Sequence, residues 1–329
     1  MNEEKLNGNL DPKEKNIDAQ ISLRPKSIDE FIGQKNIKSN LKTFIQSSKK
    51  RKKNLDHIIL YGPPGLGKTT LAHIISFEKN VNIHSTSGPA FTKKGDLVTL
   101  LSNLSNGDIL FIDEIHRLSP IIEETLYPAM EDFKCDYIIG SGPSARVMQI
   151  SIEKFTLIGA TTRLGLLSRP LRDRFGIPLQ LNFYEPDDLK NILQLNAKKL
   201  EIKIDENACL EIAKRSRGTP RIAIRLLKRI IDFSVVQELT FINIELANDS
   251  LEKLKIDEEG LDDMDRRYMK CIADNYNGGP VGIETLSAAL LEQRDIIEDV
   301  IEPYLMQRGL VQRTSRGRIL SKKGFNHLG

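Results

Sequence analysis

The first half of the chain alternates short apolar runs with segments whose apolar residues recur at helical spacing. Runs of strand length occur at 58–61, 81–85, 108–114 and 155–160. Helical spacing occurs at 69–77 and 97–104. Uninterrupted apolar runs are typical of parallel strands that are covered on both faces. This alternation predicts an α/β domain built on a parallel sheet.

The pattern changes twice after this domain. Residues 187–255 alternate helical patterns with polar breaks and contain no convincing strand, which predicts a small helical domain. From Leu261, three short helical segments precede a strand–turn–strand at 310–320, an arrangement typical of a winged helix. We place the domains at 1–184, with a polar arm at 1–20, then 185–256, then 257–329.

A β-hairpin is predicted at about 136–150, where a Gly-Ser-Gly-Pro turn separates two β-prone runs. Its apolar residues are Ile138, Ile139, Val147, Met148 and Ile150. An apolar hairpin that stands out from a domain marks a protein contact. The residues alone leave open the alternative, a hairpin folded onto its own domain.

Composition narrows the class of protein. The 329 residues are 40% hydrophobic and 28% charged, as in an ordinary globular protein, and the net charge of +3 is too small to identify a partner. No run approaches the roughly 18 apolar residues of a membrane span, and no signal sequence is present, so we expect a cytoplasmic protein. The three cysteines predict reduced thiols without a disulfide. The basic run at 49–53 is interpreted as a solvated loop rather than a nucleic-acid site.

A phosphate-binding loop follows the first apolar run. Residues 62–69 read GPPGLGKT and fit G-x-x-x-x-G-K-S/T between a strand and a helix. Glycines such as Gly65 and Gly67 let backbone N–H groups surround phosphate oxygens, and the following helix directs its positive end toward them. Lys68 would reach the β- and γ-phosphates of ATP, and the Thr69 hydroxyl would bind Mg²⁺.

Acidic and hydroxyl side chains end two of the other predicted strands. Asp113 and Glu114 follow an apolar run, at the edge where ligands of parallel sheets bind. Asp113 is expected to hold Mg²⁺ and Glu114 to activate a water molecule. Thr161 ends the run at 155–160 and is interpreted as a sensor of the γ-phosphate, the alternative being a turn-capping residue.

Basic residues gather in two later segments. Arg221 falls in the first turn of a predicted helix, an end that disfavours cations unless an anion is bound. Between residues 303 and 329 there are six Lys or Arg residues and no Asp or Glu. Such a wing favours sequence-independent contacts with DNA phosphates, although a protein-binding winged helix is the alternative.

The motifs, in their order, resemble the AAA+ ATPases and, among them, the RuvB family of Holliday-junction branch migration motors. The strings that carry the resemblance are GPPGLGKTTLA, ILFIDEIHRL, LYPAMEDF, IGATTR, SRPLRDRFGI and RGTPRIA. The resemblance implies hexameric rings on double-stranded DNA, recruitment to junctions by RuvA, and RuvC in the wider complex. It also implies a role for the hairpin as the RuvA-binding element.

The resemblance further implies roles for single residues. Nucleotide contacts within one subunit are expected from Leu23, Arg24, Gly65, Lys68, Thr69, Thr70, Tyr184 and Arg221. Arg174 corresponds to the arginine finger that reaches the neighbouring subunit's nucleotide, and Glu131, Asp132 and Phe133 lie near that same nucleotide. By the same resemblance, Arg294, Arg313 and Arg318 are expected to contact DNA.

The sequence therefore predicts an ATP hydrolase that moves DNA. Two other classes share part of the pattern. A clamp-loader subunit has the phosphate loop and the finger but lacks a basic winged-helix terminus. A nucleotide-switched DNA-binding initiator needs ATP binding with little turnover, and its DNA binding would prefer particular sequences.

Overall fold

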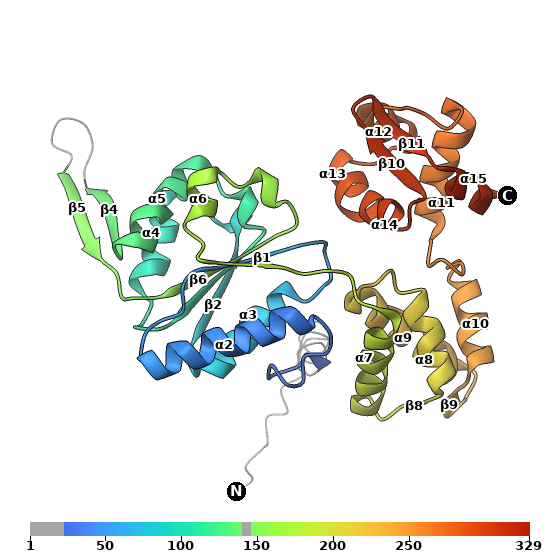
Figure 1. Cartoon of the computed structure of the whole chain (residues 1–329), viewed down its shortest axis with the longest axis horizontal. Coiled ribbons are helices and arrows are strands. Elements are labelled where there is room, and N and C mark those ends of the chain that lie inside the picture. The colour runs from blue at the N-terminus through green and yellow to red at the C-terminus, as the bar shows by residue number, and fades with distance from the viewer. Residues whose placement is uncertain (1–22, 140–145) are drawn as a thin grey trace, which may run out of the picture.

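The computed structural model describes residues 23–139 and 146–329 and contains a sheet domain, a helical lid and a C-terminal head (Figure 1). The predicted polar arm at 1–20 lies outside the described residues. In this part of the chain, no helix has the length and apolar character needed to cross a membrane. Cys135, Cys209 and Cys271 are buried free thiols.

The sheet domain is organised around five parallel strands in the order β2-β3-β6-β1-β7. Their bounds are β1 (Ile58–Tyr61), β2 (Ile83–Ser87), β3 (Ile109–Asp113), β6 (Thr156–Thr161) and β7 (Ile177–Gln180). The predicted parallel sheet is confirmed. Strand β7 has no counterpart in the prediction, because Pro178 interrupts its short alternating pattern at the edge of the sheet.

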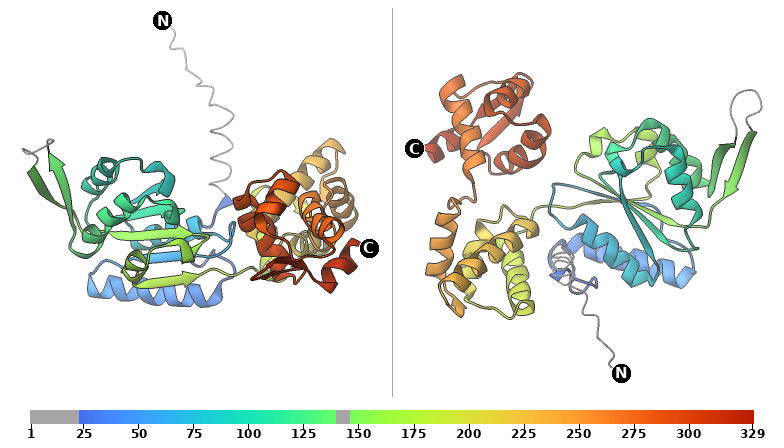
Figure 2. Two further views of the ribbon diagram at one scale, coloured as in Figure 1. Left: turned by 90° about the horizontal axis from the view of Figure 1, so that it is seen from above. Right: turned by 180° about the vertical axis from the view of Figure 1, so that it is seen from behind.

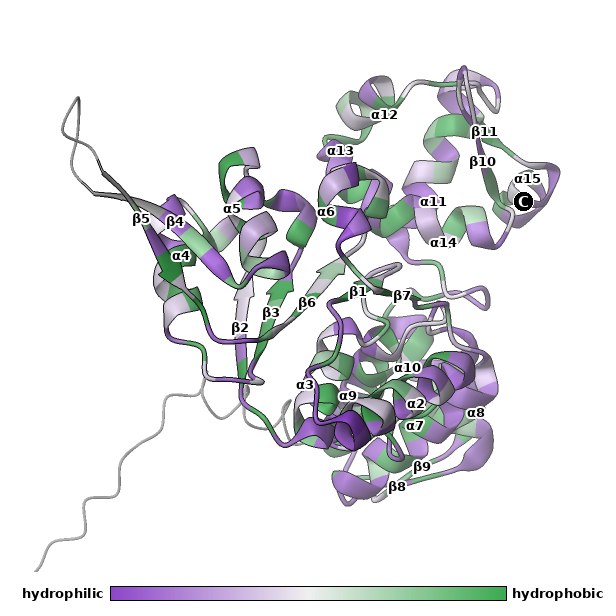
Figure 3. Ribbon diagram, turned by 60° about the vertical axis from the view of Figure 1, so that its left-hand side comes forward, coloured by the Kyte–Doolittle hydropathy of each residue, from purple (hydrophilic) through white to green (hydrophobic). Residues whose placement is uncertain are grey.

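Two hydrophobic cores cover the two faces of this sheet. Ile58 and Leu60 pack against α2 (Lys35–Arg51) and α3 (Lys68–Lys79), whereas Ile59 faces α4 (Lys94–Ser102) and α5 (Pro120–Glu131). The apolar strands β1, β3 and β6 stand out in the hydropathy colouring of Figure 3. The parallel register therefore brings the ends of β1, β3 and β6 to one edge of a rigid sheet.

The prediction that the basic run at 49–53 forms a loop is wrong for its first three residues. Helix α2 extends to Arg51, so Lys49, Lys50 and Arg51 form its last turn and are not part of a loop. Lys52 follows in a left-handed conformation with φ of 52°. Cations interact favourably with the negative end of a helix dipole, which gives this run a local structural explanation.

The lid consists of α7 (Pro186–Lys199), α8 (Glu206–Lys214), α9 (Pro220–Val236) and α10 (Ile244–Lys253). Its buried residues belong to the same core cluster as one face of the sheet. The prediction of a strandless lid is wrong in one detail: β8 (Lys203–Ile204) pairs in parallel with β9 (Phe241–Ile242). Two-residue strands are too short to produce a recognisable alternation.

The hairpin consists of β4 (Lys134–Ile139) and β5 (Arg146–Ser151), which pair antiparallel and project from the sheet domain (Figures 1 and 2). At its base Cys135 is fully buried and Ile150 packs against the core, whereas Met148 is 51% exposed. The side chains of Ile138, Ile139 and Val147 lie outside the described part of the structure. The hairpin thus rests on its own domain at the base and offers Met148 to solvent.

The head has a core of its own, built by short helices and a β-ribbon. Its elements are α11 (Asp263–Lys270), α12 (Ile283–Leu290), α13 (Arg294–Ile296), α14 (Glu302–Gln307), β10 (Val311–Thr314), β11 (Gly317–Leu320) and α15 (Lys322–Leu328). A π-helical turn at Ile297–Ile301 joins α13 to α14, so residues 294–307 are continuously helical.

A buried arginine connects the lid to the head. Arg217, in the loop before α9, donates to the carbonyl oxygen of Gly260 at 2.9 Å and pairs with the carboxylates of Asp265 and Asp262. Its guanidinium also lies over the ring of Tyr304. Arg217 is 8% exposed and Asp265 is 1% exposed, so neither charge has water as an alternative partner.

Replacing Asp265 with Ala is expected to lower the free energy of unfolding by about 3–5 kcal/mol, because it leaves the Arg217 charge buried without its main partner. Urea denaturation followed by circular dichroism measures this change. Asp263→Ala removes an exposed acid from the same helical turn and should leave the transition unchanged. An equal loss in both variants would mean that helix α11, rather than the buried pair, determines the effect.

Candidate functional site

A cavity of about 870 Å³ opens between the sheet domain and the lid. The phosphate loop, the segment that begins at Leu23, the end of β3 and the start of α9 all contribute to its wall. Eleven of the residues predicted from the sequence line it, namely Leu23, Arg24, Gly65, Gly67, Lys68, Thr69, Thr70, Asp113, Glu114, Tyr184 and Arg221.

The phosphate loop follows β1 and leads directly into α3. Gly65 and Gly67 have φ of 81° and 100°, a region in which residues with a side chain are strained. A Cβ atom on Gly65 would also approach the Cβ atom of Arg221 to 3.0 Å. No side chain caps the start of α3 and its first turn carries no acid, so its N–H groups remain available to an anion.

Lys68 is the first residue of α3, where the loop ends, and is 7% exposed. Its ammonium group donates to the carbonyl oxygens of Gly62 and Pro63 at 2.8 and 2.9 Å. Burial lowers the pKa of Lys68 to about 8, although the charges of Glu114 and Asp113 act in the opposite direction. An anion in the cavity would restore the stability of the protonated form.

The two predicted magnesium ligands lie together. The Thr69 hydroxyl oxygen is 3.5 Å from an Asp113 carboxylate oxygen, close enough for one cation to contact both. Among the described residues there is no cluster of three or more His, Cys, Asp or Glu side chains suited to a metal. A hydroxyl and one carboxylate fit Mg²⁺, which keeps several ligands from phosphates and water.

Glu114 follows Asp113 in a left-handed conformation with φ of 47°. Burial, and next the charge of Asp113, raise the pKa of Glu114, and the charge of Asp299 in the head adds to this effect. A raised pKa brings a carboxylate closer to the range in which it works as a general base. The position and the electrostatics of Glu114 therefore suit the activation of water.

Thr161 ends β6, as predicted, opposite Tyr61 at the end of β1. Its side chain is fully buried and does not line the described wall of the cavity. Its hydroxyl oxygen lies 2.9 Å from Nδ1 of His116, and that nitrogen is 3.2 Å from a Glu114 carboxylate oxygen. Burial, and next the charge of Arg163, lower the pKa of His116, which favours the neutral imidazole. Thr161 thus contacts Glu114 through His116.

His116 is the functional candidate that the sequence reading missed. It stands two positions after Glu114, inside the string that ends β3, and this proximity is its one signal in the sequence. Its contact with Thr161 depends on the neighbouring positions of β3 and β6 in the sheet.

Tyr184, at the junction before the lid, and Arg221 of the lid also line the cavity. The hydroxyl of buried Tyr184 donates to the carbonyl oxygen of Leu66 at 3.2 Å, and burial raises the pKa of this phenol. The backbone N–H of Arg221, in the first turn of α9, donates to the carbonyl oxygen of Gly65 at 3.4 Å. Arg221 therefore bonds the lid to the phosphate loop, and Tyr184 bonds the junction before the lid to the same loop.

Arg174 lies elsewhere and does not line the described wall of its own chain's cavity. It follows α6 (Arg169–Asp173), pairs with Glu131 at 3.2 Å and stacks over the ring of Tyr127 at 4.5 Å. Its side chain remains 23% exposed. Glu131 and Asp132 are exposed beside it, and Phe133 packs edge-on against Phe155. These residues form a second group, separate from the phosphate loop.

The three arginines predicted to contact DNA lie close together in the head but differ in exposure. Arg294 is 52% and Arg313 is 56% exposed. Arg318 is 6% exposed and is bound to Glu302 at 2.7 Å and Glu298 at 2.9 Å. Two of the predicted contacts are thus on the surface, whereas Arg318 lies in the core because it neutralises buried Glu302.

Comparison with known proteins accounts for nearly the whole chain. The family model of the Holliday junction DNA helicase RuvB P-loop domain matches residues 23–181. The RuvB AAA lid domain matches residues 184–257, and the RuvB C-terminal winged helix domain matches residues 258–329.

Individual relatives agree with these models. The Holliday junction branch migration complex subunit RuvB of Rhodospirillum centenum is 57% identical over 94% of this chain and 86% of that protein. The same subunit of Rickettsia africae is 57% identical over 97% of this chain and 93% of that protein. The solved structure of the Thermotoga maritima RuvB Holliday junction branch migration motor superposes with a TM-score of 0.87, at 51% identity, over 93% of this chain and 98% of that one. The chain therefore belongs to the RuvB family of P-loop AAA+ ATPases.

Proposed function

We propose that this protein is an ATP-driven translocase of double-stranded DNA that moves Holliday junctions in recombination and repair. It works in the cytoplasm as a homohexameric ring with RuvA, and with RuvC in the wider complex. The observation that carries the proposal is the match of the whole ATPase–lid–winged-helix series to RuvB proteins named as branch migration subunits and motors. The working units are residues 1–184, 185–256 and 257–329.

ATP is proposed to bind in the 870 Å³ cavity with its phosphates at the start of α3. Lys68 would leave its two carbonyl partners for the β- and γ-phosphates, and Arg221 would contact the phosphates from the lid. Leu23 and Tyr184 supply apolar surface for the base and sugar. Thr69 and Asp113 would hold Mg²⁺, which screens phosphate charge and orients the phosphoryl group.

Hydrolysis needs a water molecule in line with the γ-phosphate. Glu114 would take a proton from this water at its carboxylate, while His116 and Thr161 set the orientation of that carboxylate. Arg174 of the adjacent subunit would complete the site by stabilising the charge that develops on the phosphoryl oxygens. Each site is therefore complete at an interface between two subunits.

Force reaches DNA through the lid and the head. The lid is bonded to the phosphate loop at Arg221 and to the head at Arg217. A change of lid position with the nucleotide state would move the head, whose exposed Arg294 and Arg313 contact DNA phosphates. This geometry favours a motor over a clamp loader, which has no such head.

A synthetic four-way junction tests the proposed function. Purified protein with RuvA should separate the junction into two duplexes when ATP and Mg²⁺ are present, and should not do so with a non-hydrolysable analogue. Equal rates on junctions of different sequence would separate the motor from an initiator. No movement by a hexameric, ATP-hydrolysing preparation would contradict the proposal.

The salt dependence of DNA binding should show whether Arg313 contacts a DNA phosphate. Arg313→Ala is expected to weaken binding equally on unrelated duplexes and to make the slope of log K against log salt shallower by about one, because one phosphate contact is lost. Fluorescence anisotropy with labelled duplexes measures both quantities. Lys214→Ala, which removes a lid cation of nearly equal exposure (55% against 56%), should change neither. An unchanged slope in Arg313→Ala would exclude a phosphate contact.

Nucleotide affinity should fall as pH rises above about 8, because the free protein loses the proton of Lys68 there and must regain it to bind phosphate. The pKa of Lys68 in the folded, nucleotide-free protein is lowered to about 8. Nucleotide binding therefore takes up a proton between pH 8 and the ordinary lysine pKa of about 10.4. Titration with a fluorescent ATP analogue at successive pH values measures the slope. Lys68→Arg keeps its positive charge over this pH range, so its nucleotide affinity should not depend on pH in this way. If affinity fell equally with pH in both proteins, Lys68 would not be the group that titrates.

A further inference from the structure

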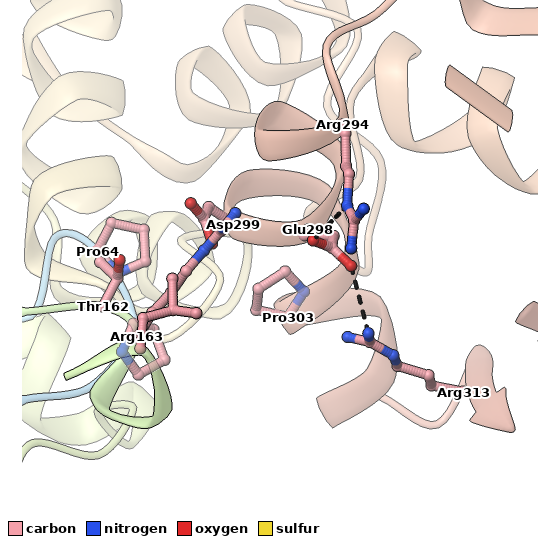
Figure 4. A pocket seen from close by; sticks show the side chains of 10 residues that line it. Pro64, Thr162, Arg163, Arg294, Glu298, Asp299, Pro303 and Arg313 are labelled. Carbon is pink, nitrogen blue, oxygen red and sulfur yellow. Dashed lines mark hydrogen bonds and ion pairs between the residues drawn. The ribbon is translucent and has the colours of Figure 1, made fainter. Parts of the chain in front are cut away.

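One arginine joins the sheet domain to the DNA-binding head. Arg163 follows β6, is 24% exposed, and donates to the carboxylates of Asp299 at 2.6 Å and Asp295 at 3.1 Å. These acids belong to the helical stretch 294–307 of the head. Figure 4 shows Arg163 and Asp299 facing each other at one side of a cavity of about 430 Å³.

The backbone of Arg163 is connected to the Glu114 carboxylate through a chain of contacts. Its N–H donates to the Thr161 hydroxyl at 3.0 Å, and this hydroxyl contacts His116, which contacts Glu114. The chain of contacts is short and mostly buried, since Thr161 is fully buried and the His116 side chain is 9% exposed. A displacement of residue 163 therefore has a direct route to Glu114.

The side chain of Arg163 is connected, through the acids that it binds, to the arginines proposed to contact DNA. Asp295 and Asp299 alternate along their helix with Arg294 and Glu298, which pair with each other at 3.1 Å. Glu298 also pairs with Arg313 at 3.3 Å, as Figure 4 shows. The acids that hold Arg163 thus lie on the same helical stretch as Arg294, and next to Glu298, which pairs with Arg313 of β10.

We propose that Arg163 is a positioning residue that transmits DNA binding by the head to Glu114 of the same subunit. The inference rests on the proposed function, since it requires a head that binds DNA. When phosphates engage Arg294 and Arg313, the helical stretch moves and the Arg163 bridge changes. The Thr161 hydroxyl and His116 then reorient the Glu114 carboxylate. Coupling of this kind requires the bridge to have a second arrangement, with both sites biasing the balance between the two.

Hydrolysis rates with and without duplex DNA test this inference. In Arg163→Ala and in Asp299→Asn, the ratio of kcat with DNA to kcat without DNA is expected to fall to about one, the value for uncoupled sites. The KM for ATP should stay constant, because Arg163 does not line the described wall of the nucleotide cavity. The affinity for DNA should also stay constant, because Arg294 and Arg313 remain.

A charge exchange separates coupling from a local effect. Arg163→Asp combined with Asp299→Arg keeps the summed length of the two side chains and reverses the bridge, so it should restore stimulation by DNA. Lys190→Glu combined with Glu206→Lys exchanges a pair inside the lid (2.8 Å) and should leave stimulation as in the unchanged protein. Because the sequence contains no Trp, Leu166→Trp places a single reporter at the rim of this cavity. Its emission should change on addition of duplex, and this change should be absent when Arg163 is Ala.

The outcomes are distinct. Stimulation that persists in Arg163→Ala and Asp299→Asn overturns the inference, and junction movement by the unchanged protein would then leave the proposed function standing. If stimulation by DNA is lost in Arg163→Ala and is not restored by the Arg163→Asp/Asp299→Arg exchange, the inference is overturned. Arg163 would then have only a local structural role beside Thr161. An unchanged protein that hydrolyses ATP at one rate with and without DNA, and moves no junction, overturns both proposals.

Discussion

Arg174→Ala is expected to lower the rate of ATP hydrolysis by roughly 10³- to 10⁵-fold, the range found for arginine fingers. The guanidinium is 23% exposed between Tyr127 and Glu131 and lies outside the nucleotide cavity of its own chain, as expected of a residue that acts on a neighbour. Release of phosphate measures the rate. Arg172→Ala removes an exposed arginine two positions away and should keep most of the activity.

Mixing two inactive variants shows whether the site is shared between subunits. Arg174→Ala keeps Glu114, and Glu114→Gln keeps Arg174, so a mixed ring contains some interfaces with both groups intact. Random mixing in equal amounts would restore about a quarter of the interfaces of a cyclic ring. If Arg174 served its own subunit, every site would retain one defect and the mixture would stay inactive.

Glu114→Gln is expected to lower the rate of hydrolysis by about 10²- to 10⁴-fold, the usual contribution of a general base, while ATP affinity is unchanged. Affinity should persist because, in the proposed binding mode, Lys68 and the start of α3 would contact the phosphates and Glu114 would contact the attacking water. The raised pKa of Glu114 also predicts that the rate in the unchanged protein falls at acidic pH as this base becomes protonated. The residual hydrolysis by Glu114→Gln should not show this fall in rate at acidic pH.

Phosphate release across a pH series and binding of a fluorescent ATP analogue measure these effects. Glu124→Gln changes an exposed acid of α5 and serves as the matched control. A Glu114→Gln variant that kept more than a tenth of the rate would assign the proton transfer to another group.

Local patterns sufficed for much of the fold and of the ATP site. The apolar runs that became β1, β3 and β6 are uninterrupted because both faces of the sheet are buried. The phosphate loop and the Asp113–Glu114 pair are fixed by their position directly after two of these runs. Their meeting at one edge follows from parallel register alone.

Other features depend on contacts between distant parts of the chain. His116 gains its place from the neighbouring positions of β3 and β6, and Arg163 gains its partners from a helix more than 130 positions later. Arg318 stands in a basic segment, yet buried Glu302 draws it into the head. The basic run at 49–51 continues a helix whose apolar face packs on the sheet domain. In each case charge or spacing was visible in the sequence, but the partner was not.

If the head binds DNA as proposed, Glu298 would determine how long each DNA contact lasts. One carboxylate holds Arg294, Arg313 and Arg318 in fixed positions before any phosphate arrives, so little side-chain freedom is lost on contact. The same negative charge competes with the phosphate once it is bound, which shortens the residence time of the contact. A protein that advances along a duplex has to release its contacts as regularly as it makes them. In the proposed motor, an acid placed among the arginines would favour both fast capture and fast release of DNA.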